Sequence, residues 1–229
     1  MFSHVSIIQW FQDTVRKAPQ HTAVKEYRDK QVKSITYQKL FSRSYCLAEQ
    51  MRGWGVDSLL LIIAHSSIKL TEWVFAAIQC GIPFMLLDEN VSAEKVYSLC
   101  AEDTVILTDI PHWHYPIVKG KLYYSQDITL SNDSTLMYEN KDYKDVKKMP
   151  LYQIFTSGSG GCPKRIQIHQ EGILNYIDWR IRTYRITSND VILQILSPLF
   201  DGFYSNFFTA LLSGATLIVY DYIGMSGLP

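Results

Sequence analysis

A regular alternation of apolar strands and helices constrains the fold of this chain more than any other feature. Short, continuous apolar runs at Leu59–Ala64, Pro83–Leu87 and Thr104–Thr108 are separated by helical patterns at Lys69–Cys80 and Ser92–Cys100. Strands without a polar face are buried on both sides, which is typical of parallel sheets. The pattern therefore predicts an α/β fold, a layered parallel β-sheet with helices on both faces.

The flanking segments supply further elements. Helical spacing of apolar residues predicts a first helix over residues 4–17 and another from Tyr37 to about Arg52, with Thr36 as the N-cap of the second. A third is expected over residues 202–213. Strands are predicted at 22–27, 32–36, 151–155, 165–169 and 216–220. The polar stretch from about 126 to 149 indicates an exposed connection, and we expect residues 1–229 to belong to a single domain.

Charge and composition exclude several kinds of partner. The chain has 22 Lys+Arg and 22 Asp+Glu, so no general positive field attracts nucleic acid. No apolar stretch approaches the roughly 20 residues of a membrane span, and the N-terminus lacks the pattern of a secretory signal, so we expect no membrane partner and a cytoplasmic protein. The four cysteines are expected as free thiols, and His112 and His114 have no accompanying cluster, so no metal site is expected.

One segment, Thr156–Lys164, reads Thr-Ser-Gly-Ser-Gly-Gly-Cys-Pro-Lys and points to phosphate chemistry. Its glycines allow backbone amides to converge on an anion, its hydroxyls add donors, and Lys164 adds charge. A Gly- and Ser-rich run is often a flexible linker, but strand-like flanks favour a tight connection here. The GxxxxGK[ST], GxGxxG and GxSxG patterns do not fit.

This segment resembles the phosphate-binding core motif of the adenylate-forming enzymes, Thr-Ser-Gly-Ser-Thr-Gly-x-Pro-Lys-Gly. Other stretches resemble motifs of nonribosomal peptide synthetase adenylation domains, in the same order along the chain: Ile35–Leu40, Ala76–Asp88, Ile168–Asn175, Phe200–Asp201 and Ala210–Val219. The resemblance covers essentially the whole chain. It implies the N-terminal part of the adenylate-forming enzyme fold.

The resemblance also implies a reaction, in which an amino acid carboxylate attacks the α-phosphorus of ATP and the acyl group then passes to a carrier-protein thiol. ATP and Mg²⁺ are the implied cofactors. The implied phosphate-loop residues are Thr156, Ser157, Gly158, Ser159, Gly160, Gly161 and Lys164. Asp201 would pair with the substrate's α-ammonium, while Gly202 and Ser205 would line the side-chain pocket. Without the family, Asp201 is equally well interpreted as the N-cap of the helix that follows it.

Two positions depart from the family motif. Gly160 replaces the second Thr, and Arg165 replaces the Gly after Lys164, so we expect weaker ATP binding. The later family motifs for adenine, ribose and the mobile C-terminal domain with its catalytic lysine find no match. We therefore expect about the first half of an adenylation domain, with no catalytic residue assigned.

The absence of those motifs predicts a chain that is inactive alone, and the departures at Gly160 and Arg165 favour a structural or docking module. The alternatives are the N-terminal half of a split adenylating enzyme, active with a partner chain, and a fragment of an ordinary adenylation domain without a role of its own. Expected partners are condensation or carrier-protein domains of a synthetase, a second-half chain, or a second copy. We expect the uncovered apolar surface on the helix at 202–213 and beside the strand Thr216–Tyr220. The apolar helix residues are Phe203, Phe207, Phe208, Leu211 and Leu212.

Overall fold

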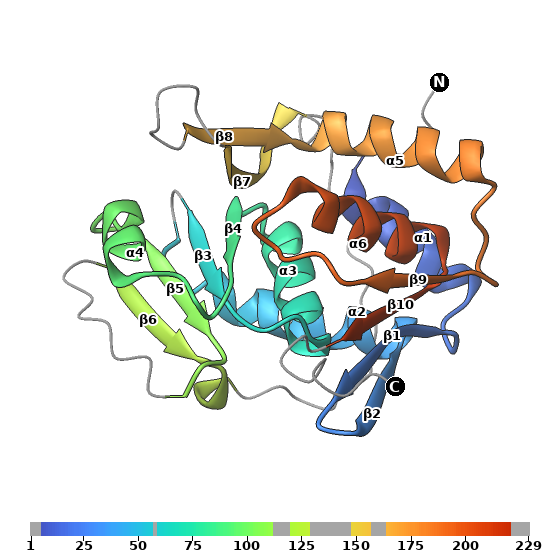
Figure 1. Cartoon of the computed structure of the whole chain (residues 1–229), viewed down its shortest axis with the longest axis horizontal. Coiled ribbons are helices and arrows are strands. Elements are labelled where there is room, and N and C mark those ends of the chain that lie inside the picture. The colour runs from blue at the N-terminus through green and yellow to red at the C-terminus, as the bar shows by residue number, and fades with distance from the viewer. Residues whose placement is uncertain (1–5, 57–58, 112–119, 129–147, 157–163, 221–229) are drawn as a thin grey trace.

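Two β-sheets organise the chain in this computed structural model (Figure 1). The structure describes residues 6–56, 59–111, 120–128, 148–156 and 164–220. The strands are β1 (Thr22–Arg28), β2 (Gln31–Thr36), β3 (Leu60–Ile63), β4 (Phe84–Leu87), β5 (Val105–Thr108), β6 (Lys121–Tyr124), β7 (Pro150–Thr156), β8 (Lys164–His169), β9 (Val191–Gln194) and β10 (Thr216–Tyr220). The helices are α1 (Ile7–Lys17), α2 (Tyr37–Met51), α3 (Ile68–Cys80), α4 (Ala93–Leu99), α5 (Gln170–Tyr184) and α6 (Asp201–Ser213), with a 3-10 turn at Ser125–Asp127.

The predicted α/β class is confirmed, but the strands form two sheets where the sequence pattern indicated one. Within the described ranges, the first sheet has the order β2-β1-β10-β9 and the second has the order β6-β5-β3-β4-β7-β8. Neighbouring strands run parallel except for the pairs β1–β2 and β7–β8, which are antiparallel at sheet edges. The division arises because β1 pairs with β10, from the opposite end of the chain, with Val24 beside Leu217.

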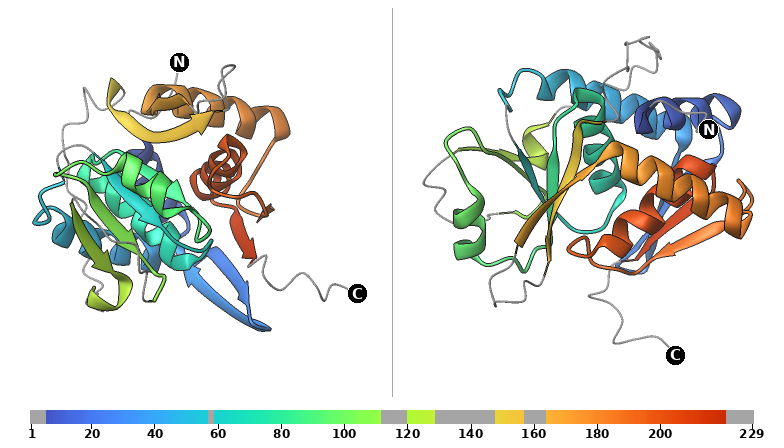
Figure 2. Two further views of the ribbon diagram at one scale, coloured as in Figure 1. Left: turned by 60° about the vertical axis from the view of Figure 1, so that its left-hand side comes forward. Right: turned by 90° about the horizontal axis from the view of Figure 1, so that it is seen from above.

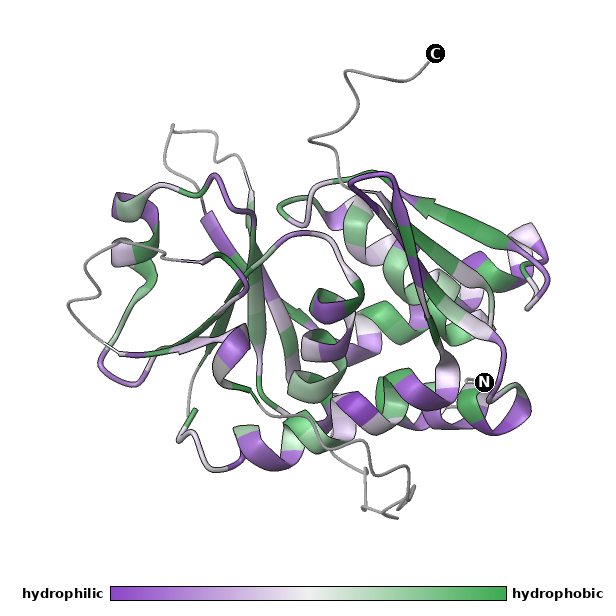
Figure 3. Ribbon diagram, turned by 90° about the horizontal axis from the view of Figure 1, so that it is seen from below, coloured by the Kyte–Doolittle hydropathy of each residue, from purple (hydrophilic) through white to green (hydrophobic). Residues whose placement is uncertain are grey.

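The strands β3, β4 and β5 of the second sheet are buried on both faces, as their continuous apolar runs predict. Side chains alternate along β3: Leu60 and Ile62 enter the main core, and Leu61 and Ile63 enter a smaller core under α4. The main core joins this sheet to the other sheet and to α1, α2, α3 and α6. Figure 2 shows the two sheets side by side, and Figure 3 shows apolar residues along their strands.

Helix ends follow the local sequence. Ser6 caps α1 by accepting from Gln9 N, so this helix begins at Ile7 and not at residue 4. Thr36 caps α2 as predicted, accepting from Lys39 N at 3.3 Å. Gly81 ends α3 with φ +71°, a left-handed conformation that glycine adopts without strain.

Helix α6 is not the uncovered helix that the sequence suggested. The side chains of Phe203, Phe207, Phe208, Leu211 and Leu212 are each no more than 1% exposed. They are covered because α6 contacts α1, α5, β9 and β10. Strand β10 also has a neighbour on each side, so among the described strands the edges of this sheet are β9 and β2.

Three elements, β6, α5 and β9, were not among those predicted from the sequence. The expected connection at 126–149 lies mostly outside the described residues, as do His112, His114 and Cys162. Cys46, Cys80 and Cys100 are not in disulfides. None of the helices described here has the length and apolar character that crossing a membrane requires.

Candidate functional site

The glycine-rich segment connects the ends of an antiparallel strand pair. Thr156 is the last residue of β7 and lies opposite Lys164, the first residue of β8. The prediction of a strand on each side of this segment is therefore confirmed. The five other predicted phosphate-loop residues, Ser157, Gly158, Ser159, Gly160 and Gly161, lie outside the described residues.

Both ends of this connection are open to solvent. Thr156 and Lys164 are exposed, and β7 lies parallel to β4, so Thr156 lies at the carboxyl edge of the six-stranded sheet. In parallel α/β sheets this is the edge where ligands bind. Arg165, which departs from the family motif, is exposed on the edge strand β8 opposite Phe155, where a long side chain has room.

The three predicted substrate-binding residues lie together on the first two turns of α6. Asp201 is the first helical residue, and Ser205 Oγ donates to the Asp201 carbonyl oxygen at 3.4 Å. A Cβ added to Gly202 would lie 2.7 Å from Leu196 Cδ1, so a larger residue would displace that side chain. The interpretation of Asp201 as an N-cap is wrong: Phe200 occupies that position, and no side chain caps the helix.

Two tyrosines that were not among the predicted site residues lie near Asp201. Burial raises the pKa of Tyr152 on β7, and the negative charge of Asp201 adds to this rise. Hydrogen bonds with Ser205 and Arg180 lower the pKa of Tyr176 on α5. Tyr152 also stacks on Tyr204 of α6, with ring centroids 3.7 Å apart.

Strand β7 connects the two parts of the candidate site. Tyr152 interacts electrostatically with Asp201, and Thr156 lies four residues further along the same strand, about 13 Å at roughly 3.3 Å per residue. Tyr176 could have been found through α5, whose apolar residues Ile173, Leu174, Ile177 and Ile181 follow helical spacing.

A cavity of about 480 Å³ lies at the carboxyl ends of strands from both sheets. Its lining includes His65 after β3, Asp88 after β4, and Ser197 and Phe200 in the segment before α6. Ser197 Oγ lies 3.4 Å from Asp88 Oδ2. His65 is fixed by Asp109, whose Oδ1 lies 3.2 Å from its Nδ1, and this hydrogen bond raises the pKa of the imidazole. Among the described residues, no group of three or more His, Cys, Asp or Glu is arranged to hold a metal.

The fold is that of an α/β protein with an antiparallel strand pair, β7–β8, on either side of the glycine-rich segment. A profile of the AMP-binding enzyme family matches residues 11–224. The chain belongs to this family.

Known relatives are nonribosomal peptide synthetases. The chain is 29% identical over 216 residues to tyrocidine synthase 3 of Brevibacillus parabrevis, and the match covers 92% of this chain and 3% of that protein. The NpsA N-terminal subdomain of Klebsiella oxytoca has a similar structure, with a TM-score of 0.80 and 20% identity, covering 98% of this chain and 56% of that one. The nonribosomal peptide synthetase FmoA3 also has a similar structure, with a TM-score of 0.79 and 20% identity, and the match covers 96% of this chain and 23% of FmoA3. The chain thus corresponds to part of an adenylation N-terminal subdomain.

Proposed function

We propose that this chain is a partial adenylation domain of nonribosomal peptide biosynthesis, that it is inactive alone, and that it docks onto other synthetase domains. The observation that carries the proposal is the combination of a retained candidate site with an uncovered sheet edge. Family membership and similarity to peptide synthetases support the pathway. We infer a cytoplasmic location, where ATP and amino acids are available.

The side chains available on this chain fit the binding of ATP and an amino acid. Thr156 and Lys164 are exposed opposite one another at the ends of the loop, where they would contact the β- and γ-phosphates together with Ser157 and Ser159. Asp201 is exposed and is not used as a cap, so its carboxylate is available to an α-ammonium group. ATP with Mg²⁺ supplies the electrophilic phosphorus and the pyrophosphate leaving group.

These residues would act by positioning and by neutralising charge. Lys164 would offset phosphate charge at the loop, while Asp201 would hold the amino group at the start of α6. Gly202 and Ser205 would line the pocket for the side chain of the amino acid substrate. The family relies on further groups to bind adenine and ribose and to exclude water, which supports the proposal that these residues alone do not catalyse adenylation.

Docking would use an apolar surface that we call the β9 surface. It comprises Tyr176 and Trp179 of α5, Leu193 of β9, and Ile195, Leu199 and Phe200 in the segment that follows. Trp179, Leu193 and Phe200 are 52%, 51% and 63% exposed, respectively. In the described residues β9 pairs only with β10, so its other edge offers unpaired backbone groups. An added strand with an apolar face would satisfy both features.

The test of this proposal is amino-acid-dependent exchange of pyrophosphate into ATP, measured on the pure chain. We expect exchange at background for every proteinogenic amino acid. Light scattering on the same sample, alone and mixed with condensation or carrier-protein domains, should show association that Leu193→Lys abolishes. Exchange well above background by the chain alone, or a strict monomer that binds none of these domains, would contradict the proposal.

A second candidate function is that of a split enzyme, active when a partner supplies the rest of the domain. The exposed Asp201, whose carboxylate does not cap α6, favours the split enzyme. A purely structural module has no use for a carboxylate held beside Tyr152 and Tyr176. The test is to add the segment that follows the matched region in tyrocidine synthase 3 as a separate chain. Exchange that appears only in the mixture, and is lost in Asp201→Asn, would favour this function over docking alone.

A further inference from the structure

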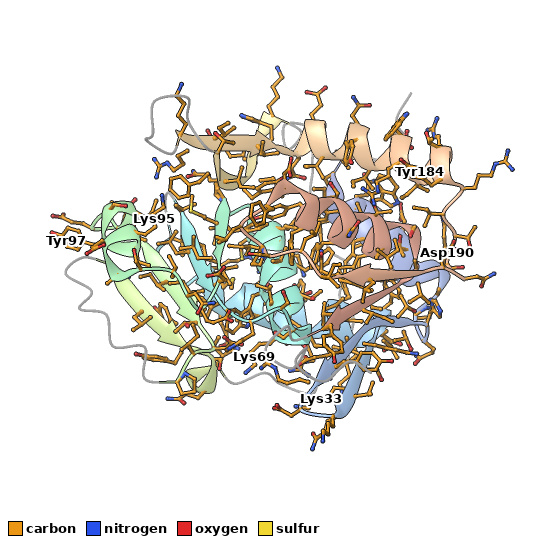
Figure 4. All side chains as sticks on the ribbon, viewed as in Figure 1. Lys33, Lys69, Lys95, Tyr97, Tyr184 and Asp190 are labelled. Atoms are coloured by element: carbon orange, nitrogen blue, oxygen red, sulfur yellow. The ribbon has the colours of Figure 1, made fainter. Side chains whose placement is uncertain are left out.

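A second pocket lies between the β1–β2 hairpin, α2 and the first turns of α3, and it shares no lining residue with the cavity at the strand ends. Its volume is about 470 Å³, which suits a small molecule. Five cationic side chains line it: Arg28, Lys33, Lys39, Arg43 and Lys69. Figure 4 shows Lys33 and Lys69 at the same edge of the molecule, on β2 and at the start of α3. The chain has no net charge, so this is a local concentration of positive charge.

Two of the three carboxylates in the pocket lining already have partners. Glu26 Oε2 accepts from Ile68 N at 2.9 Å, at the start of α3. Asp109 Oδ1 accepts from His65 N at 3.3 Å and lies 3.2 Å from His65 Nδ1. These bonds hold the two carboxylates in place without removing their charge, but the five cationic side chains outnumber the three carboxylates, so the pocket stays cationic.

The third carboxylate, Glu72, is buried without satisfied hydrogen bonds. Its side chain is 1% exposed, and neither carboxylate oxygen has a hydrogen-bond partner among the described residues. Arg43 Nε approaches Oε1 to 2.9 Å, but this contact lacks hydrogen-bond geometry, and Arg43 Nε is itself unsatisfied. A buried acid and a buried guanidinium nitrogen that both lack hydrogen bonds indicate room for a further group that bonds to them.

We propose that this pocket binds a tetrahedral dianion of the phosphate class, held by Arg43, Lys69 and Lys39, and that the protonation of Glu72 controls its affinity. The guanidinium of Arg43 presents several N–H donors in a planar fork that matches phosphate oxygens. Protonated Glu72 would donate its O–H to the anion, whereas ionised Glu72 would repel it and compete for Arg43.

The electrostatics of Glu72 suit this role near neutral pH. Burial raises the pKa of Glu72 to about 7, and it outweighs the lowering effects of Arg43, Lys69 and Lys39. Glu26 adds a smaller rise. Arg28 and Lys33 face the pocket from β1 and β2, and the His65–Asp109 pair lies at its border. A bound dianion would favour the protonated form of Glu72 still further.

The test is binding of sulfate to the full chain carrying Lys164→Ala, which removes the phosphate loop's cation. Sulfate keeps its charge between pH 6 and pH 8, whereas phosphate gains a proton in that range, so sulfate reports on the protein alone. Titration followed by the Arg Nε–H signals in NMR should give a dissociation constant of about 1 mM at pH 6 and roughly tenfold weaker binding at pH 8, the effect of one added nearby negative charge. Inorganic phosphate should shift the same signals.

Variants separate this site from general charge effects. Glu72→Gln should bind sulfate equally at both pH values and about tenfold more tightly than the parent at pH 8. Arg43→Gln and the exposed Lys69→Gln should each weaken binding several-fold, while Arg182→Gln, on α5, should not change it. The proposal is overturned if only an adventitious ion binds, with no Arg43 shift below about 50 mM. It is equally overturned if the pH dependence persists in Glu72→Gln, which would assign it to His65.

Discussion

The substitution Glu72→Gln should make the stability of the folded chain independent of pH over a range where the parent loses stability. Burial raises the pKa of Glu72 from its ordinary value of 4.5 to about 7 in the folded state. Between these two values the folded state holds a proton that the unfolded state has lost. The contribution of Glu72 to stability is therefore fully present below pH 4.5 and is lost as the pH rises through 7.

The magnitude follows from the difference between the two pKa values. A difference of about 2.5 corresponds to about 3.4 kcal/mol at roughly 1.36 kcal/mol per pKa unit. About 2 kcal/mol of this should be lost between pH 5 and pH 7. Gln has nearly the same shape and no charge to bury, so the variant should gain about 2 kcal/mol over the parent across that interval. For a chain of this length, this corresponds to a change in Tm of roughly 4–8 °C.

The measurement is urea denaturation followed by far-UV circular dichroism, at several pH values in buffers without phosphate or sulfate. The quantity compared is the free energy of unfolding of Glu72→Gln minus that of the parent. Glu102→Gln serves as the control, because Glu102 is an exposed loop carboxylate whose loss should change stability by less than about 0.5 kcal/mol at every pH. A difference that stays flat or falls as the pH rises would refute the reasoning, since it would mean that Glu72 is ionised throughout.

Three further predictions follow from the core, the β9 surface and the loop. Phe75→Ala should cost about 3–5 kcal/mol in the free energy of unfolding by urea, because the ring is fully buried and stacks on Phe11 at 3.9 Å; a loss below about 1 kcal/mol would show that the site collapses. Leu193→Lys should leave the urea midpoint unchanged and remove association in light scattering, whereas unchanged association would place the docking surface elsewhere. Lys164→Ala should weaken ATP, GTP and triphosphate alike by at least about tenfold in calorimetry, and adenine-selective binding by the parent would contradict this.

Periodicity predicted the six-stranded sheet best where both faces are buried. The apolar runs at β3, β4 and β5 have no polar position, so only a strand between two helical layers fits them. Strands β6 and β9 lie at sheet edges and are partly exposed. Strand β6 has the mixed sequence Lys-Leu-Tyr-Tyr, whereas β9 begins with the apolar run Val-Ile-Leu, a signal that could have indicated a strand. The division into two sheets depends on pairing β1 with β10, a contact between distant segments that no local pattern encodes.

The candidate site divides in the same way. The strands that flank the loop were predictable, because strand-like apolar patterns border the Gly-rich run on both sides. The surroundings of Asp201 were not, since Tyr152 and Tyr176 reach it from β7 and α5. Glu72 was also unpredictable: it stands on a helix whose neighbours are almost all apolar, and only the tertiary structure shows that it is buried beside Arg43.

The wrong expectation for α6 changes where a partner would bind. A helix with apolar residues around most of its circumference must be covered on several sides, and the sequence pattern indicated that the cover was missing. The structure shows that α1, α5, β9 and β10 supply it from within the chain. Covering α6 leaves the outer sides of α5 and β9 themselves exposed, with Trp179 and Leu193 half open to solvent. A partner therefore has no access to the apolar residues of α6 and would instead extend the sheet at β9, close to the segment that leads into Asp201. Docking at this edge and completion of the substrate pocket would then be a single event, which is why the exchange assay and the association assay need to be performed on the same mixtures.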